Sequence, residues 1–169
     1  LDTLHQIIGA ASNSKVELVT EFLLELGFTI VKCSNAESAE FAKLISNAWR
    51  DTIFGVSNEI ALMAESIGLD AAEIIHVANY KYPRANIPSA GPVGGPCLYK
   101  DSHILLNSFS QEFREQSIIH SARTVNEQVE LNIYELLLQH LEIDLEVLFI
   151  GAAFKGSPKT NDIRNGLTS

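Results

Sequence analysis

The chain has 169 residues, of which 46% are hydrophobic and 20% charged, a composition that suits a globular protein with one core or a little more. Its net charge is −9, so it lacks the cationic excess that would neutralise nucleic-acid phosphates or bind an anionic membrane surface. Because it has two cysteines and no uncharged apolar run of about 18 residues, we expect a reduced, cytoplasmic protein rather than a disulfide scaffold or a membrane protein.

The start of the chain predicts a strand, a helix and a second strand. Gln6–Ala10 is a short apolar run, and Ser12 or Asn13 can cap a helix that ends at Gly27. Phe28–Cys33 is rich in residues that favour strands. Since such a unit cannot bury both of its faces alone, residues 1–33 are predicted to be the edge of a larger α/β sheet.

One long helix is predicted over Ala36–Ile67, capped by Ser34 or Asn35 and closed by Gly68. Its apolar face consists of Phe41, Ile45, Ala48, Trp49, Val56, Ile60, Met63 and Ile67. A polar line contains Glu40, Lys43, Asn47, Arg50 and Asn58. A polar line is usually the solvent side, but apolar residues interrupt this one. We therefore expect the helix to be largely buried, with its lysine and asparagines in need of partners.

The rest of the chain predicts further helices and a final strand. Ala71–Asn79, capped by Asp70, precedes a Pro- and Gly-rich loop. Helices are predicted over Lys100–Phe109 and Gln111–Leu141, and a buried strand over Leu145–Ile150. The predicted fold is a mainly α central domain with long helices, flanked by α/β (Rossmann-like) fragments at both ends. The chain starts without Met and stops inside what reads as a new unit, so we expect a piece of a larger protein.

The segment Gly91–Asp101 reads G-P-V-G-G-P-C-L-Y-K-D and places Cys97 in a glycine-rich turn. Gly94 and Gly95 allow another molecule to approach the backbone closely. A thiol on such a loop is presented as a nucleophile, because the thiolate is the reactive form and a nearby cation or helix N-terminus favours it. The alternative is a tight turn in which the cysteine is an inert small residue. His5, His76 and His103 show no metal-ligand spacing, so no metal site is predicted.

Several blocks of sequence together resemble the UDP-glucose/GDP-mannose dehydrogenase family. They are, in order, Ala39-Glu40, Lys43, Asn47, Asn58-Glu59, Arg84, the cysteine loop, G-A-A-F-K at 151–155 and Asp162-Ile163-Arg164. The resemblance implies three domains: 1–33 as the end of an NAD-binding domain, 34–141 as the central helical dimerisation domain, and 142–169 as the start of a nucleotide-sugar-binding domain. It also implies a homodimer through the central helices.

The resemblance implies a reaction in which the C6 alcohol of a nucleotide sugar becomes a carboxylate, using two NAD⁺ and one water. Cys97 would capture the aldehyde as a thiohemiacetal and then carry a thioester. Asp101 would help to activate the hydrolytic water, and Lys43 and Asn47 would point at the C6 oxygen. The stretch Tyr82–Ile87 resembles the members that oxidise UDP-N-acetylhexosamines more than those that oxidise UDP-glucose.

The resemblance implies further roles in binding. Arg84, Gly94, Gly95 and Lys100 would contact the sugar nucleotide, Lys155 would contact phosphate or pack domains, and Arg164 would lie toward the cofactor. The G-x-G-x-x-G loop that binds NAD is absent from the sequence, so the main NAD-binding domain is predicted to be missing and the chain alone to be inactive.

Two other classes remain open. The chain could be a stand-alone helical dimerisation module in which Cys97 is incidental. It could instead be a cysteine hydrolase or redox protein, which would need a histidine or second cysteine beside Cys97. His103 and Cys33 are the nearest candidates in the sequence, and neither makes a recognisable constellation.

Overall fold

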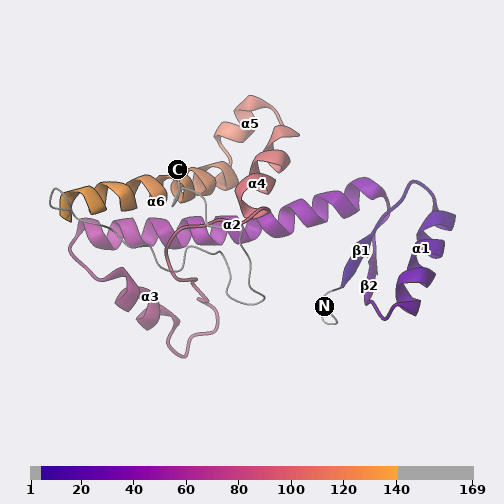
Figure 1. The fold of residues 1–169 in the computed structure, drawn as a ribbon, viewed down its shortest axis with the longest axis horizontal. Helices are drawn as coiled ribbons and strands as arrows, with labels where there is room; N and C mark the ends of the chain where they lie inside the picture. Colours follow the sequence, from indigo (N-terminus) through magenta and orange to yellow (C-terminus); the bar gives the residue numbers. More distant parts are fainter. Residues whose placement is uncertain (1–4, 141–169) are drawn as a thin grey trace. The chain divides into compact units, whose positions relative to one another are not determined.

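The computed structural model describes residues 5–140, which are mainly helical with one short parallel sheet (Figure 1). The chain divides into two compact units, Leu1–Ser46 and Asn47–Ser169, and the division falls within one long helix. The elements are β1 (Gln6–Ile8), α1 (Asn13–Glu25), β2 (Ile30–Lys32), α2 (Ala36–Ser66), α3 (Ala71–Asn79), α4 (Leu98–Asn107), α5 (Gln111–Glu115) and α6 (Ile118–His140).

The first unit contains the predicted strand, helix and strand. β1 and β2 pair in parallel, with Gln6 opposite Ile30 and Ile8 opposite Lys32. α1 connects the two strands and ends at Gly27, whose φ of 82° is the left-handed conformation that glycine adopts without strain. The prediction for this segment is confirmed as a local unit. The second flanking fragment, 142–169, lies outside the described residues.

α2 begins and ends where the sequence predicts. The side chain of Asn35 accepts a hydrogen bond of 2.7 Å from the Ser38 N–H and so caps the first turn. Gly68, with φ 73°, closes the helix. Local capping chemistry therefore sets both ends of this 31-residue helix.

Apart from Ala48, the residues of α2 that face the core do not belong to the predicted apolar face. The buried residues are small or polar, namely Asn47, Ala48, Asp51, Gly55, Ser57, Asn58 and Ala64. The predicted apolar face is largely exposed, including Phe41, Ile45, Trp49, Val56, Met63 and Ile67. The expectations that α2 is largely buried and that Lys43 is buried are wrong, because Lys43 is exposed.

Close packing of α6 on α2 explains this inversion. A Cβ atom on Gly55 would lie 2.6 Å from the Ala122 carbonyl oxygen, so the two backbones meet where neither helix has a large side chain. Small residues allow this approach, and the polar side chains beside them pair across the interface. The apolar face is left on the outside of the chain.

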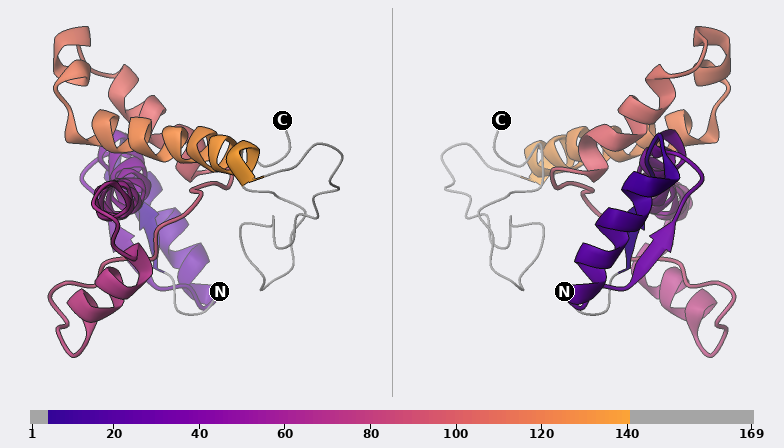
Figure 2. Two further views of the ribbon diagram at one scale, coloured as in Figure 1. Left: turned by 90° about the vertical axis from the view of Figure 1, so that its left-hand side faces the viewer. Right: turned by 90° about the vertical axis from the view of Figure 1, so that its right-hand side faces the viewer.

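The remaining helices differ from prediction in the bounds of α4, which is Leu98–Asn107 and not Lys100–Phe109, and in a break within the last predicted helix. α3 has the predicted bounds, and Asp70 caps it by accepting from the Ala72 and Glu73 N–H groups. The single helix predicted over Gln111–Leu141 is instead α5 and α6, which lie on different axes (Figure 2). The break falls at Gln116 and Ser117, where the Ser117 hydroxyl accepts from the Ile119 N–H at 3.2 Å and caps α6. Within residues 5–140, no helix combines the length and apolarity needed to cross a bilayer.

Candidate active site

Cys97 occupies the N-cap position of α4, at the end of the glycine-rich loop. Its side chain is exposed and its thiol is free. Gly95, two residues earlier, is buried and has φ 101°, a conformation that residues with a Cβ rarely adopt. The loop thus turns on a glycine and presents the thiol at the first turn of a helix, as the sequence predicts.

Asn47 and Asp101 meet in the interior of the second unit. The Asn47 Nδ2 group donates to Asp101 Oδ2 at 2.6 Å, and the two residues are 3% and 7% exposed. Asp101 lies one helical turn after Cys97 in α4, and its N–H donates to the Cys97 carbonyl oxygen at 2.9 Å. Three of the four predicted catalytic residues therefore share one small region around the start of α4.

Lys43, the fourth predicted catalytic residue, precedes Asn47 by one turn of α2 but belongs to the first unit. Its convergence on Cys97 stays a prediction. Among the predicted substrate contacts, Lys100 is an exposed residue of α4 and Gly94 lies in the cysteine loop. Arg84 is exposed in a turn between α3 and α4 that is closed by the bond from the Ala85 N–H to the Tyr82 carbonyl. Lys155 and Arg164 lie outside the described residues.

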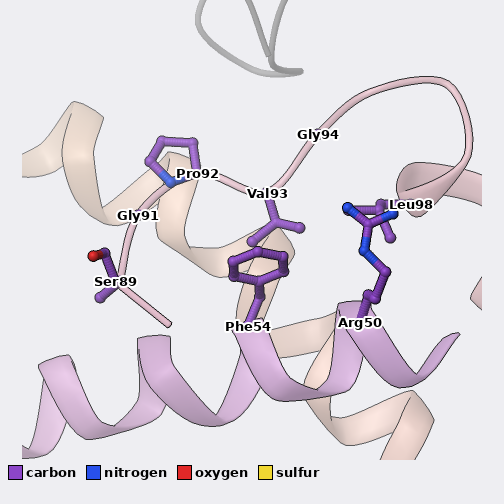
Figure 3. A pocket seen from close by; sticks show the side chains of 9 residues that line it. Arg50, Phe54, Ser89, Gly91, Pro92, Val93, Gly94 and Leu98 are labelled. Carbon is purple, nitrogen blue, oxygen red and sulfur yellow. The ribbon is translucent and has the colours of Figure 1, made fainter. Parts of the chain in front are cut away.

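A pocket of about 290 Å³ lies between α2 and the cysteine loop (Figure 3). Figure 3 shows the Phe54 ring beneath Val93, and the Arg50 side chain extended toward Leu98. Backbone of the loop forms the opposite wall, so peptide groups and one guanidinium face a partly apolar floor. The lining residues are Arg50, Phe54, Ser89, Ala90, Gly91, Pro92, Val93, Gly94 and Leu98.

A buried polar cluster that the sequence pattern did not predict joins α2, α4 and α6. Its members are Asp51, Ser102, Arg123 and Asn126, joined by the predicted Asn58. Each is at most 2% exposed. One signal was available, because Asn47, Asp51 and Asn58 have the spacing of a single helix face. The partners on α4 and α6 carry no local sign of this role.

A family model described as "UDP-glucose/GDP-mannose dehydrogenase family, central domain" matches residues 37–128. Among curated proteins, the UDP-N-acetyl-D-mannosamine dehydrogenase of Pyrococcus horikoshii is 33% identical over 95% of this chain and 38% of its own length. The enzyme of the same name from Methanocaldococcus jannaschii is 30% identical over 90% of this chain and 35% of its own length. The chain therefore spans little more than a third of the length of these relatives.

The solved structures that resemble this chain carry the same enzyme name as these curated relatives. The structure of UDP-D-ManNAc dehydrogenase from Pyrococcus horikoshii superposes with a TM-score of 0.67 at 33% identity, covering 79% of this chain and 32% of that one. A UDP-N-acetyl-mannosamine dehydrogenase from Staphylococcus aureus has the same fold, with a TM-score of 0.60 at 23% identity over 82% of this chain and 32% of its own. Together with the family match over more than half of the residues, these similarities show that the chain belongs to the UDP-glucose/GDP-mannose dehydrogenase family.

Proposed function

We propose that this chain is the central part of an NAD-dependent nucleotide-sugar 6-dehydrogenase, which oxidises the C6 alcohol of a UDP-N-acetylhexosamine to a carboxylate. The observation that carries the proposal is the exposed Cys97 thiol at the start of α4, with Asp101 one turn away and held by Asn47. The relatives named UDP-N-acetyl-D-mannosamine dehydrogenase support this class of sugar, as does the stretch Tyr82–Ile87.

Cys97 supplies the covalent step. Its sulfur adds to the C6 aldehyde carbon, a C–S bond forms, and the aldehyde oxygen takes a proton to give a thiohemiacetal. This adduct loses a hydride from C6 and the proton of its hydroxyl group, which leaves a thioester on Cys97. Water then attacks the thioester carbon, a C–O bond forms, the C–S bond breaks, and the sulfur leaves to regenerate the thiol.

Asp101 and Asn47 activate the water that attacks the thioester. The Asp101 carboxylate accepts a proton from the attacking water, and the Asn47 amide holds that carboxylate in place. Lys43, one turn before Asn47 on α2, donates toward the developing oxyanion at C6. Because a fixed donor of this kind contributes about 10²–10³ in rate, Lys43 is expected to affect turnover more than binding.

The nicotinamide cofactor implied by the family accepts hydride, but the described residues do not fit its pyrophosphate. The turn after β1 reads Gly9-Ala10-Ala11-Ser12 and has one glycine where the dinucleotide loop needs three. A Cβ on Gly9 would overlap the Asn35 carbonyl, so this glycine serves the packing of its own unit. No part of hydride transfer is therefore assigned to residues 5–140.

The pocket beside the cysteine loop suits part of the nucleotide sugar. Arg50 brings a cation to a chain whose net charge is −9, as a pyrophosphate ligand requires. The loop backbone around Gly94 and Gly95 lies against the sugar, and Arg84 and Lys100 contact the nucleotide. Lys155 and Arg164 lie outside the described residues, and their roles stay predictions from the resemblance.

Turnover by the full-length enzyme that carries this chain tests the proposal. With UDP-N-acetyl-D-mannosamine, the wild type should form two NADH for each uronate, whereas Cys97→Ala should form no measurable uronate because the aldehyde is not captured. Cys33→Ala is the control, since Cys33 is the other of the two cysteines in the 169 residues of this chain. A Cys97→Ala enzyme that makes uronate at the wild-type rate, or a wild type that reduces no NAD⁺ with any nucleotide sugar, would contradict the assignment.

A further inference from the structure

Asp51 is the centre of a buried hydrogen-bond network in the second unit. Its Oδ1 atom accepts from Arg123 Nη1 and from Asn126 Nδ2, both at 2.8 Å, and its Oδ2 atom accepts from the Ser102 hydroxyl at 2.8 Å. Asp51 is 1% exposed and Arg123 2% exposed, so the ion pair is almost fully desolvated. The extra hydrogen bonds satisfy the carboxylate that this burial would otherwise leave unpaired.

One branch of the network reaches the residue that follows Cys97. Arg123 Nη1, which donates to Asp51, also donates to the Leu98 carbonyl oxygen at 3.3 Å. Ser102 lies one turn further along α4, and its hydroxyl is held by the same aspartate. The first two turns of the helix that presents the thiol are therefore tied to α2 and α6.

The other branch reaches the opposite end of the cysteine loop. Asn126 Oδ1 accepts from Asn58 Nδ2 at 2.8 Å. Asn58 then holds Gly91 at both of its backbone groups, since the Gly91 N–H donates to Asn58 Oδ1 at 2.7 Å and Asn58 Nδ2 donates to the Gly91 carbonyl at 3.1 Å. Gly91 and Leu98 bound the loop, so one continuous chain of hydrogen bonds fixes both of its ends.

A buried ion pair is weak evidence for stability, because its desolvation cost offsets most of its attraction. The value of such a network lies in the single geometry that it permits, since every member has few alternative partners. Here the segment that gains a single geometry is Gly91–Leu98, which belongs to no helix or strand until α4 begins. The network connects this loop to the interface of α2 with α6.

We propose that Asp51 is a positioning residue for the reaction, which acts through Arg123 and Ser102 on one side and through Asn126 and Asn58 on the other to fix the Cys97 thiol opposite the reacting carbon. The catalytic part of this inference, the placement of the thiol for reaction, rests on the proposed function. Its structural part, the coupling of Asp51 to both ends of the loop, does not depend on any substrate.

Amide hydrogen exchange on the 169-residue chain tests that structural part. Asp51→Asn removes the charge but keeps the shape, and Ser102→Ala removes one branch only. The informative position is the Gly91 N–H, which neither residue touches. Asp51→Asn should speed its exchange at least tenfold while the amides in the middle of α6 exchange as in the wild type. The matched control is Thr52→Ala, which removes a hydroxyl bonded within α2 to the Ala48 carbonyl.

The control is measured in enough denaturant to give the same free energy of unfolding as the variants. If Gly91 exchanges no faster in Asp51→Asn than in this control, Asp51 does not position the loop and the inference is overturned. Ser102→Ala keeps the test decisive if Asp51→Asn does not fold, because it should speed exchange in the first turn of α4, at Lys100 and Asp101, and leave α6 unchanged.

Kinetics of the full-length enzyme test the catalytic part. A displacement of the thiol by about 1 Å can cost about 10²-fold, so Asp51→Asn should lower kcat by about 10–100-fold and change KM less than twofold. Loss of folded enzyme alone would also lower the apparent kcat at unchanged KM, so kcat is calculated per folded enzyme, with the folded fraction measured by circular dichroism. If the wild type has no turnover, the proposed function fails while the exchange result stands. If the wild type is active and Asp51→Asn has the same kcat, the inference fails alone.

Discussion

Asn47 and Asp101 are 54 positions apart in the chain, and their side chains share a hydrogen bond of 2.6 Å in the interior. An amide opposite a carboxylate is a pair in which the donor and the acceptor are both defined. Converting the amide to a second carboxylate would place two like charges in contact and leave both without a donor. The free energy of unfolding therefore depends on the chemical identity of each side chain as well as on its size.

We expect Asn47→Asp to lower the free energy of unfolding by about 1–3 kcal/mol, because it removes the donor and buries two carboxylates together. The reciprocal double variant, Asn47→Asp with Asp101→Asn, restores one donor and one acceptor at the same positions. It should recover at least half of the loss in chemical denaturation at neutral pH. Equal stability of the single and double variants would show that the bond contributes nothing.

At the scale of single residues, the sequence predicts which side chains lie close together where their spacing is local. Cys97 and Asp101 are close because they are four positions apart in a helix, which is visible in the sequence. Asp51 was missed because a polar residue on a helix looks the same whether it faces water or an arginine. Its partner Arg123 is 72 positions away, and only the folded chain brings the two together.

At the scale of elements, Gly55 decides how closely α2 and α6 approach. Gly55→Ala should lower the free energy of unfolding by about 1–3 kcal/mol, because a Cβ there meets the backbone of Ala122 at less than 3.0 Å. Chemical denaturation followed by circular dichroism measures the loss.

Gly68→Ala makes a useful comparison for this prediction. Gly68 has φ 73° and open space around its Cβ position, so alanine there costs only the backbone strain of about 1–2 kcal/mol. Gly55→Ala should therefore lower the free energy of unfolding more than Gly68→Ala, and Ala122→Gly should not rescue it, because the nearest atom is the Ala122 carbonyl oxygen of the backbone. If Gly55→Ala costs no more than Gly68→Ala, close helix contact is not the reason for the glycine.

The bounds of the elements were largely predictable because caps and glycines are local signals. Asn35, Asp70 and Gly68 each mark a helix end by chemistry that two or three neighbouring residues provide. The break between α5 and α6 was missed because Gln116 and Ser117 include neither glycine nor proline. A serine hydroxyl that caps a new helix is indistinguishable in the sequence from one on a helix surface.

At the scale of the whole molecule, the exposed apolar face of α2 is a candidate interaction surface. Trp49, Val56 and Met63 are 63%, 46% and 63% exposed and follow one another at intervals of seven residues along one side of the helix. Apolar residues aligned in this way on a monomer surface mark an interaction site. We propose that a second copy of this chain covers the face, which is the homodimer that the family resemblance implies.

Sedimentation velocity measures the oligomeric state and so tests this proposal directly. The wild-type chain should sediment as a dimer at micromolar concentration, and Val56→Glu should shift it to a monomer because a charge is buried in the interface. Leu18→Glu is the control, since Leu18 on α1 is 68% exposed and belongs to a different helix. A wild type that stays monomeric, or a Val56→Glu variant that stays dimeric, would show that this face has another role.

The sequence could not reveal which face of α2 is buried. Hydrophobic spacing identified the apolar side correctly, but the side that packs within the chain is decided by α6, whose contacts with α2 span 68 to 75 positions. An apolar face can be covered by the same chain or by another one, and the spacing of the residues is identical in the two cases. The inversion is therefore a property of the assembled chain.

Mass spectrometry of the acid-quenched full-length enzyme, mixed with UDP-N-acetyl-D-mannosamine and NAD⁺, tests the central claim most directly. The peptide that contains Cys97 should gain the mass of the uronyl nucleotide joined as a thioester, and hydroxylamine should remove it. Slower hydrolysis in Asp101→Asn should increase the fraction of enzyme that carries this adduct. Uronate formation with no adduct on Cys97 in either enzyme, or an adduct on another residue, would contradict the account.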